Sequence, residues 1–320
     1  MKIFKKIFSR REPALLLIII ALSLIISIFS PHFLSGTNII SMFVALTVEG
    51  IIVLGMVLLL IIAGLDLSVG SVMAFTGVAV AMMINKGIPV FLSILAALLL
   101  ALAIGLLNGF LISEIGLNSF ITTLGMMMVV KGLMLVISQG KAVLNMPASF
   151  KAIGQGKIAG IQYPILIMIV LVIVMDLLVR HTRFMRQTYY IGSSELAARL
   201  NGIHVKKIKM LMYCLSSFFA GLAGVLITAR FGNASVTLGD NTAMNVITAA
   251  IIGGASLNGG QGTVLGAFLG AVFMQLISTS LNMLSVNMYW QNFVTGAILI
   301  IAILIDAING KRKTGRKVIA

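Results

Sequence analysis

Charge and cysteine are both scarce in this sequence. Only 10% of its 320 residues are charged, whereas 60% are hydrophobic and the mean hydropathy is +1.14. Soluble domains carry about 25% charged residues, and a chain this apolar could not cover its own surface in water. A bilayer must therefore solvate much of the protein. The single cysteine, Cys214, excludes an intrachain disulfide and lies in an apolar run, which is typical of a buried structural thiol.

Motifs for catalysis and nucleotide binding are also missing. The sequence contains no G-x-x-x-x-G-K-[ST] phosphate loop and no G-x-S-x-G nucleophile motif. Its three histidines and eight acidic residues are scattered, so none of them has the spacing of metal ligands. We therefore expect a protein that is not an enzyme, with no catalytic residue, no metal and no cofactor.

The net charge of +15 is concentrated in three places. Basic residues gather before the first apolar run, between Arg180 and Lys209, and again from Lys311 to Lys317. Segments rich in Lys and Arg beside membrane helices stay on the cytoplasmic side. We therefore predict that both termini and the 180–209 segment are cytoplasmic, and we expect no nucleic-acid binding.

Apolar runs predict an all-α polytopic membrane protein with about ten transmembrane segments. We expect a single membrane domain, with a cytoplasmic N-terminus at 1–13, a transmembrane core at 14–308 and a cytoplasmic basic tail at 309–320. The first run has no signal-peptide cleavage pattern, which favours an uncleaved anchor. The runs lie at about 14–29, 44–63, 67–84, 89–112, 119–137, 163–179, 210–229, 245–255, 264–284 and 293–308.

Two segments of the chain depart from the pattern of simple spanning helices. The polar, turn-forming stretch at 138–162 is the longest loop expected outside the cytoplasm. The run at 245–255 is too short to span hydrocarbon about 30 Å thick, so we expect a broken or re-entrant helix there.

Two stretches of the sequence resemble each other. Residues 61–70 align without gaps on residues 251–260, and five of the ten positions are identical. Each copy leaves an apolar helix, passes glycine and small polar residues, and enters a second helix. Transporters often bind substrate between repeats at such interrupted helices. We therefore predict an internal repeat, parallel or inverted, with the translocation path beside it.

Asp66 is the most informative residue of the first copy. A carboxylate among apolar runs is costly unless it is solvated or hydrogen-bonded, so Asp66 and Ser68 either cap the following helix or contact substrate. Other neutral polar side chains either join membrane helices or line the path. The path candidates are Gly64, Asp66, Ser68, Gly70, Asn108, Asn118, Asn245, Gly253, Gly254, Asn258 and Gly259.

A short amphipathic helix is predicted within the basic segment. Ser194 is a good N-cap, and Leu196, Leu200 and Ile203 recur at helical spacing on one face. Gly202 permits a sharp turn back toward the membrane. A brief helix with one arginine suits the groove of a partner protein better than a lipid surface.

This segment resembles the EAA coupling loop of bacterial ABC importer permeases. Glu195, Ala197, Ala198 and Gly202 match that pattern, although one residue separates the Glu from the Ala pair and the downstream proline is absent. With residues 64–70 and 251–262, the loop makes the chain similar to the ribose-type sugar permeases of the ribose/branched-chain amino acid permease superfamily. The resemblance extends over about residues 14–308.

The resemblance implies a permease subunit of the bacterial inner membrane that moves a neutral monosaccharide by alternating access. It also implies a cytoplasmic ABC ATPase, an extracytoplasmic sugar-binding protein and a second permease subunit, usually a copy of the same chain, within membrane lipid. The 138–162 loop is then either a contact for the binding protein or a plain connector. The alternative is an ion-coupled secondary transporter that works alone, with Glu49 and Asp66 as its coupling sites.

Overall fold

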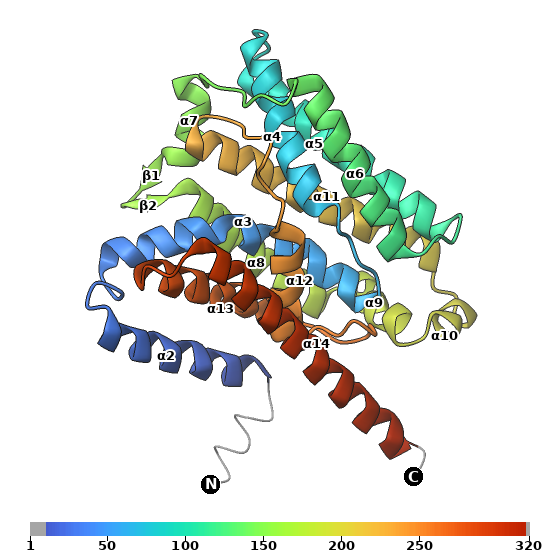
Figure 1. Cartoon of the computed structure of the whole chain (residues 1–320). Helices are drawn as coiled ribbons and strands as arrows, with labels where there is room; N and C mark the ends of the chain where they lie inside the picture. The colour runs from blue at the N-terminus through green and yellow to red at the C-terminus, as the bar shows by residue number, and fades with distance from the viewer. Residues whose placement is uncertain (1–10, 318–320) are drawn as a thin grey trace.

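The computed structural model describes residues 11–317, so the first ten residues of the basic N-terminal segment and the last three of the tail lie outside the described part. Thirteen helices and one two-stranded sheet occupy this part of the chain (Figure 1). The helices are α2 (Arg11–Phe29), α3 (Gly36–Ile61), α4 (Val69–Asn85), α5 (Val90–Ser113), α6 (Ser119–Ser138), α7 (Ala148–Gln155), α8 (Tyr163–His181), α9 (Arg183–Ser193), α10 (Glu195–Leu200), α11 (Val205–Phe231), α12 (Thr242–Ile252), α13 (Val264–Met283) and α14 (Met288–Lys317). The strands are β1 (Lys157–Ile158) and β2 (Ile161–Gln162).

Eight of the described helices are long and apolar enough to cross a membrane, namely α2, α3, α5, α6, α8, α11, α13 and α14. Two further apolar helices are shorter, α4 with 17 residues and α12 with 11. These ten helices correspond one to one with the ten apolar runs of the sequence. The prediction of an all-α, multi-pass membrane protein with interrupted helices is therefore confirmed.

Polar contacts join several helix ends at one end of the protein. The carboxylate of Glu12, at the start of α2, accepts a hydrogen bond of 2.6 Å from Thr263, which precedes α13. It also lies 3.5 Å from the guanidinium of Arg180, near the end of α8. Lys206 at the start of α11 forms a 2.8 Å ion pair with Glu114, directly after α5.

A second set of contacts marks the opposite end of the helices. Asn85 closes α4 and donates a 3.0 Å hydrogen bond to the carbonyl of Leu144, in the loop before α7. Gln155 at the end of α7 donates to the carbonyl of Arg230, near the end of α11, over 2.8 Å. The chain thus runs back and forth between two ends, with α9 and α10 at the end that holds the start of α2 (Figure 1).

Small residues bring α11 into backbone contact with three neighbouring helices. A Cβ on Gly224 would lie 2.1 Å from the carbonyl oxygen of Met73 in α4. A Cβ on Gly55 of α3 would lie 2.5 Å from the Cα of Ser216 in α11. A Cβ on Gly105 of α5 would lie 2.7 Å from a carbonyl oxygen of α11. Without a hydrophobic force between helices in lipid, such close packing is a main source of their association.

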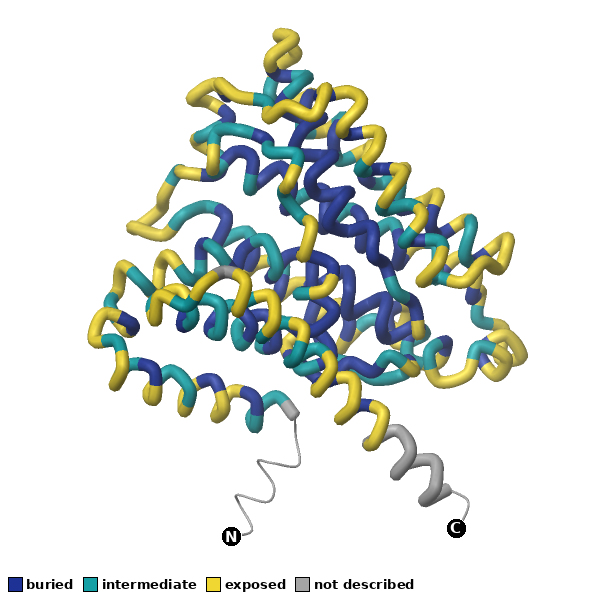
Figure 2. The backbone as a smooth tube through the Cα atoms, viewed as in Figure 1, coloured by how far each residue is buried: buried dark blue, intermediate teal, exposed yellow. Residues whose placement is uncertain are grey.

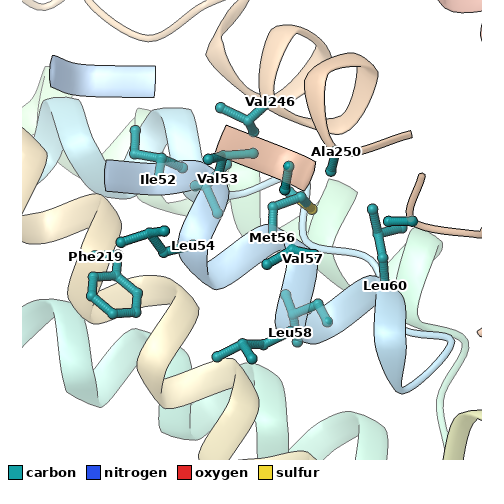
Figure 3. Packing of buried hydrophobic residues seen from close by; sticks show 14 of the residues in the cluster. Ile52, Val53, Leu54, Met56, Val57, Leu58, Leu60, Phe219, Val246 and Ala250 are labelled. Atoms are coloured by element: carbon teal, nitrogen blue, oxygen red, sulfur yellow. The ribbon is translucent and has the colours of Figure 1, made fainter. Parts of the chain in front are cut away.

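The core lies where α3 meets α11 and α12. Every residue of α3 from Gly50 to Ile61 is buried, and its apolar side chains pack against Phe219, Val246 and Ala250 (Figure 3). Exposed apolar side chains instead cover much of α2, α5, α6 and α14. Figure 2 marks many residues of these outer helices as exposed or intermediate. The buried part of α3, which is apolar all round, is an interior helix. The exposed apolar helices are instead suited to contact with lipid or with a second membrane subunit.

The stretch at 138–162 is more ordered than its polar sequence suggests. It contains α7 and the antiparallel pair β1–β2. Phe150 of α7 is fully buried, and a Cβ on Gly154 would lie 2.2 Å from the backbone nitrogen of Arg230. The turn-forming residues of this stretch predict a loop. Phe150 and Gly154 are nevertheless enough to hold a short helix against the end of α11.

The two similar stretches of the sequence form similar local structures. Gly64 donates its N–H to the carbonyl five residues earlier at 2.8 Å, and Ala255 does the same at 2.9 Å. The left-handed residue that ends each helix is Ala63, with φ of 57°, and Gly254, with φ of 101°. The helix ends therefore match with an offset one residue longer than the ungapped sequence alignment.

Gly224→Ala should lower the melting temperature of the protein purified in detergent. The added Cβ would overlap the carbonyl of Met73, and overpacking of this kind costs about 1–3 kcal/mol. Gly125→Ala is the matched control, because none of the described residues comes within 4 Å of a Cβ at that position in α6. Equal losses in the two variants would contradict the packing described above.

Candidate functional site

Asp66, Ser68 and Asn108 form a polar network in the interior of the protein, and each of the three is 0% exposed. Asp66 Oδ1 accepts hydrogen bonds from the backbone N–H of Ser68 at 2.9 Å and from its hydroxyl at 2.5 Å. The Asn108 amide, from α5, donates to Ser68 Oγ at 3.0 Å. Ser216 Oγ, from α11, donates to Asp66 Oδ2 at 3.5 Å. The network therefore joins the loop between α3 and α4 to two other helices.

The expected capping of α4 by the Ser68 side chain is wrong. Ser68 does precede α4, but within the described structure its side chain makes no cap hydrogen bond. Its hydroxyl donates to Asp66 instead, since a carboxylate that is fully buried needs hydrogen-bond donors from the protein. Asp66 and Ser68 are thus structural partners of each other, and neither is exposed in this conformation.

Asp306 of α14 is the buried carboxylate at the second loop, and it was not among the residues predicted from the sequence. Its carboxylate accepts a 3.0 Å hydrogen bond from the Ser256 hydroxyl and a 3.3 Å bond from the backbone N–H of Leu257. Asn258 donates its N–H to Ser256 Oγ at 3.3 Å, just as Ser68 donates to Asp66. The signal available in the sequence was an acidic residue inside an apolar run.

The glycine candidates lie where backbones touch. A Cβ would lie 2.1 Å from a carbonyl oxygen of another segment at both Gly70 and Gly253, and 2.7 Å from one at Gly259. At Gly64 it would lie 2.9 Å from the Tyr213 hydroxyl. Four of the five predicted glycines therefore permit another segment to approach the backbone closely. Gly254 instead supplies the left-handed conformation that ends α12.

The remaining asparagine candidates belong to separate contacts. Asn245 of α12 donates a 2.7 Å hydrogen bond to Glu49 of α3, which gives that membrane-level carboxylate a neutral partner. Asn118 caps α6 by accepting from the N–H of Phe120 at 2.9 Å. Asn258 is exposed. The structure thus brings Asp66, Ser68 and Asn108 together but gives the other three asparagines different surroundings.

The predicted amphipathic helix is present as α10. Ser194 caps it by accepting a 3.3 Å hydrogen bond from the N–H of Ala197. Glu195 forms ion pairs with Arg199, one turn later, and with Lys209 of α11. Burial acts to raise the pKa of Glu195, but the hydrogen bonds from Lys209 and Arg199 outweigh it and hold that pKa below its usual value. Glu195 is therefore ionised at neutral pH and ties α10 to α11.

The two leucines of α10 point outward. Leu196 is 70% exposed and Leu200 is 81% exposed, whereas Ala198 is buried against the chain. Gly202 follows with φ of +76°, a conformation that glycine adopts without strain, and reverses the chain toward α11. Ile203, expected on the same face as the leucines, is only partly exposed. The helix thus turns its two leucines outward and packs Ala198 against the rest of the protein.

Comparison with known proteins places the chain in a family. The family described as branched-chain amino acid transport system / permease component matches residues 38–303. The ribose import permease protein of Haemophilus influenzae is 34% identical over 311 residues, which cover 96% of this chain and 95% of that protein. The L-arabinose ABC transporter permease protein of Azospirillum brasilense is 33% identical over 304 residues, or 95% of this chain and 90% of that protein. No solved structure gives a significant match.

The fold and the buried loop networks define a multi-pass membrane protein built around interrupted helices. The chain belongs to the family of branched-chain amino acid transport system permease components. The resemblance to ribose-type permeases found in the sequence is confirmed by relatives that extend over nearly the whole chain. Members of this family are transport subunits rather than enzymes.

Asp66→Ala should destabilise the protein more than Asp66→Asn. Alanine removes the acceptor of two buried donors of Ser68, and each unpaired buried donor costs about 1–3 kcal/mol. Asparagine keeps one side-chain oxygen. Melting in detergent measures the difference, with Asp240→Ala as control, because that carboxylate is 52% exposed and an exposed ion pair contributes little. Equal losses from Asp66→Ala and Asp66→Asn would contradict the network.

Proposed function

We propose that this chain is the transmembrane permease subunit of an ATP-driven importer and translocates a neutral monosaccharide. A separate cytoplasmic ATPase drives alternating access, and a ribose-like pentose, a hexose or a related sugar is the substrate. The observation that carries the proposal is α10, which is fixed to α11 through Glu195 and turns two leucines outward. The ribose and arabinose permeases among the relatives support the class of substrate.

The shape of α10 suits a groove in the ATPase. Exposed apolar residues rimmed by polar ones mark sites of protein interaction, and Leu196 and Leu200 are flanked by Glu195 and Arg199. A hollow of about 370 Å³ lies along the same segment, between Tyr190 and the small residues of α10. We assign the ATPase contact to the predicted coupling residues Glu195, Ala197, Ala198, Leu200 and Gly202.

The membrane-level carboxylates support an uncharged substrate. Glu49 is hydrogen-bonded to Asn245, and Asp66 is hydrogen-bonded to Ser68. Both carboxylates therefore have hydrogen-bond partners in the protein. The alternative, an ion-coupled transporter with Glu49 and Asp66 as its sites, leaves α10 without a role.

The positions of the remaining partners depend on which end of the helices is cytoplasmic. We place α9, α10 and both termini on the cytoplasmic side, because the basic segments lie there. The sugar-binding protein then docks at the opposite end, where α7 and the β1–β2 hairpin provide an ordered surface. A second copy of the chain covers part of the exposed apolar helices, and lipid covers the rest.

Reconstituted uptake tests this function. Labelled ribose, arabinose and glucose would be offered to vesicles that contain the chain together with a candidate ATPase and binding protein. The proposal expects uptake of at least one sugar that requires ATP and both partners. Uptake by the chain alone, driven by an ion gradient, would contradict it and restore Glu49 and Asp66 as coupling sites.

Leu200→Asp should abolish co-purification of the ATPase without lowering the melting temperature of the permease. Leu200 is 81% exposed, so the isolated permease tolerates a charge, whereas a buried leucine contributes about 1.5–3 kcal/mol to an interface. Leu144→Asp is the control, because Leu144 is 54% exposed near α7 at the opposite end. Retention of the ATPase by Leu200→Asp would exclude α10 as the docking helix.

A further inference from the structure

Three backbone segments meet at the end of α9. A Cβ on Gly192 would lie 1.8 Å from the carbonyl oxygen of Ile61 and 2.5 Å from the backbone nitrogen of Gly260. Gly260 itself donates its N–H to the carbonyl of Ile61 at 2.8 Å. The backbone of α9 therefore touches the end of α3 and the loop after α12 at one point, and only glycine leaves room for both.

Two more contacts of α9 hold the loop after α12. Tyr189 donates its hydroxyl proton to the carbonyl of Gly262 over 2.8 Å. A Cβ on Gly260 would lie 2.5 Å from Ser193 Oγ, and one on Gly259 would lie 2.8 Å from the Cβ of Ala63. The loop after α12 is thus packed between α9 on one side and the loop after α3 on the other.

These contacts are continuous with α10 on one side and with the buried networks on the other. A single residue, Ser194, separates α9 from α10 and caps α10. The loop after α3 leads to Asp66, and the loop after α12 leads to Ser256 and its partner Asp306. The contacts of α9 therefore connect α10 to both interrupted helices without passing along a spanning helix.

We propose that α9 couples α10 to both interrupted helices, with Gly192 and Tyr189 as its positioning residues. This inference rests on the proposed function and adds the part of the membrane domain that receives the movement of the ATPase. Gly192 keeps the three backbone segments in contact, and Tyr189 makes the loop after α12 follow α9. The two loops then move together, and with them the ends of α3 and α12.

Tyr189→Phe tests this role because it removes one hydroxyl and keeps the ring. In vesicles with the ATPase and binding protein, sugar uptake per ATP hydrolysed should fall about fivefold, the factor that corresponds to one neutral hydrogen bond. Binding of the ATPase to the permease should be unchanged. Tyr163→Phe is the control, because Tyr163 begins α8 at the opposite end and should leave the ratio as in the wild type.

Hydrogen exchange of the assembled complex gives a readout that does not depend on uptake. When a non-hydrolysable ATP analogue binds the wild-type complex, amides of 61–66 and 256–262 should change their exchange together. In Tyr189→Phe the change at 256–262 should be lost while α10 stays protected by the ATPase.

Either of two results would overturn the inference. One is an uptake-to-ATP ratio for Tyr189→Phe equal to that of the wild type. The other is unchanged exchange at both loops in a wild-type complex whose α10 is protected. A failure of the proposed function is distinct from both, because the wild-type α10 would then gain no protection from the ATPase.

Discussion

The structure depends on satisfying polar groups where helices stop inside a membrane protein. Hydrocarbon offers no hydrogen-bond partner, so backbone that leaves a helix at membrane depth must be paired by the protein itself. Two loops that end apolar helices are each organised by a buried carboxylate: Asp66 pairs with Ser68, and Asp306 pairs with Ser256. The glycines around these loops let other backbone segments approach them closely.

The close packing of the helices and the proposed transport function both depend on how α11 contacts its neighbours. Because α11 touches α3, α4 and α5 through small residues, those helices form a dense block around the Asp66 network. The proposed movement takes place at the edges of that block, where α9 and α10 are joined to the two loops. Proteins that alternate between two conformations combine rigid parts with a few movable contacts in this way.

Much of the fold could be predicted from the sequence, because apolar runs of about 20 residues have one stable form in a bilayer. The α10 helix was also predictable, since Ser194, Glu195 and Gly202 determine its start and end locally. Asp306 and the contact of Gly192 with Ile61 were not, because they join residues far apart in the chain. The assignment of Ser68 as a cap failed for a related reason: local propensity favours the cap, but a buried carboxylate nearby competes for the hydroxyl.

Site-directed cross-linking tests the central claim, that α10 is the contact with an ATPase, most directly. Cys214 is the only cysteine, so a Cys214→Ala chain with Leu200→Cys carries one thiol for a photoactivated cross-linker. The account predicts a covalent adduct between permease and ATPase from Leu200→Cys and none from Leu144→Cys. An adduct from Leu144→Cys alone, or from neither variant in a complex that transports sugar, would contradict it.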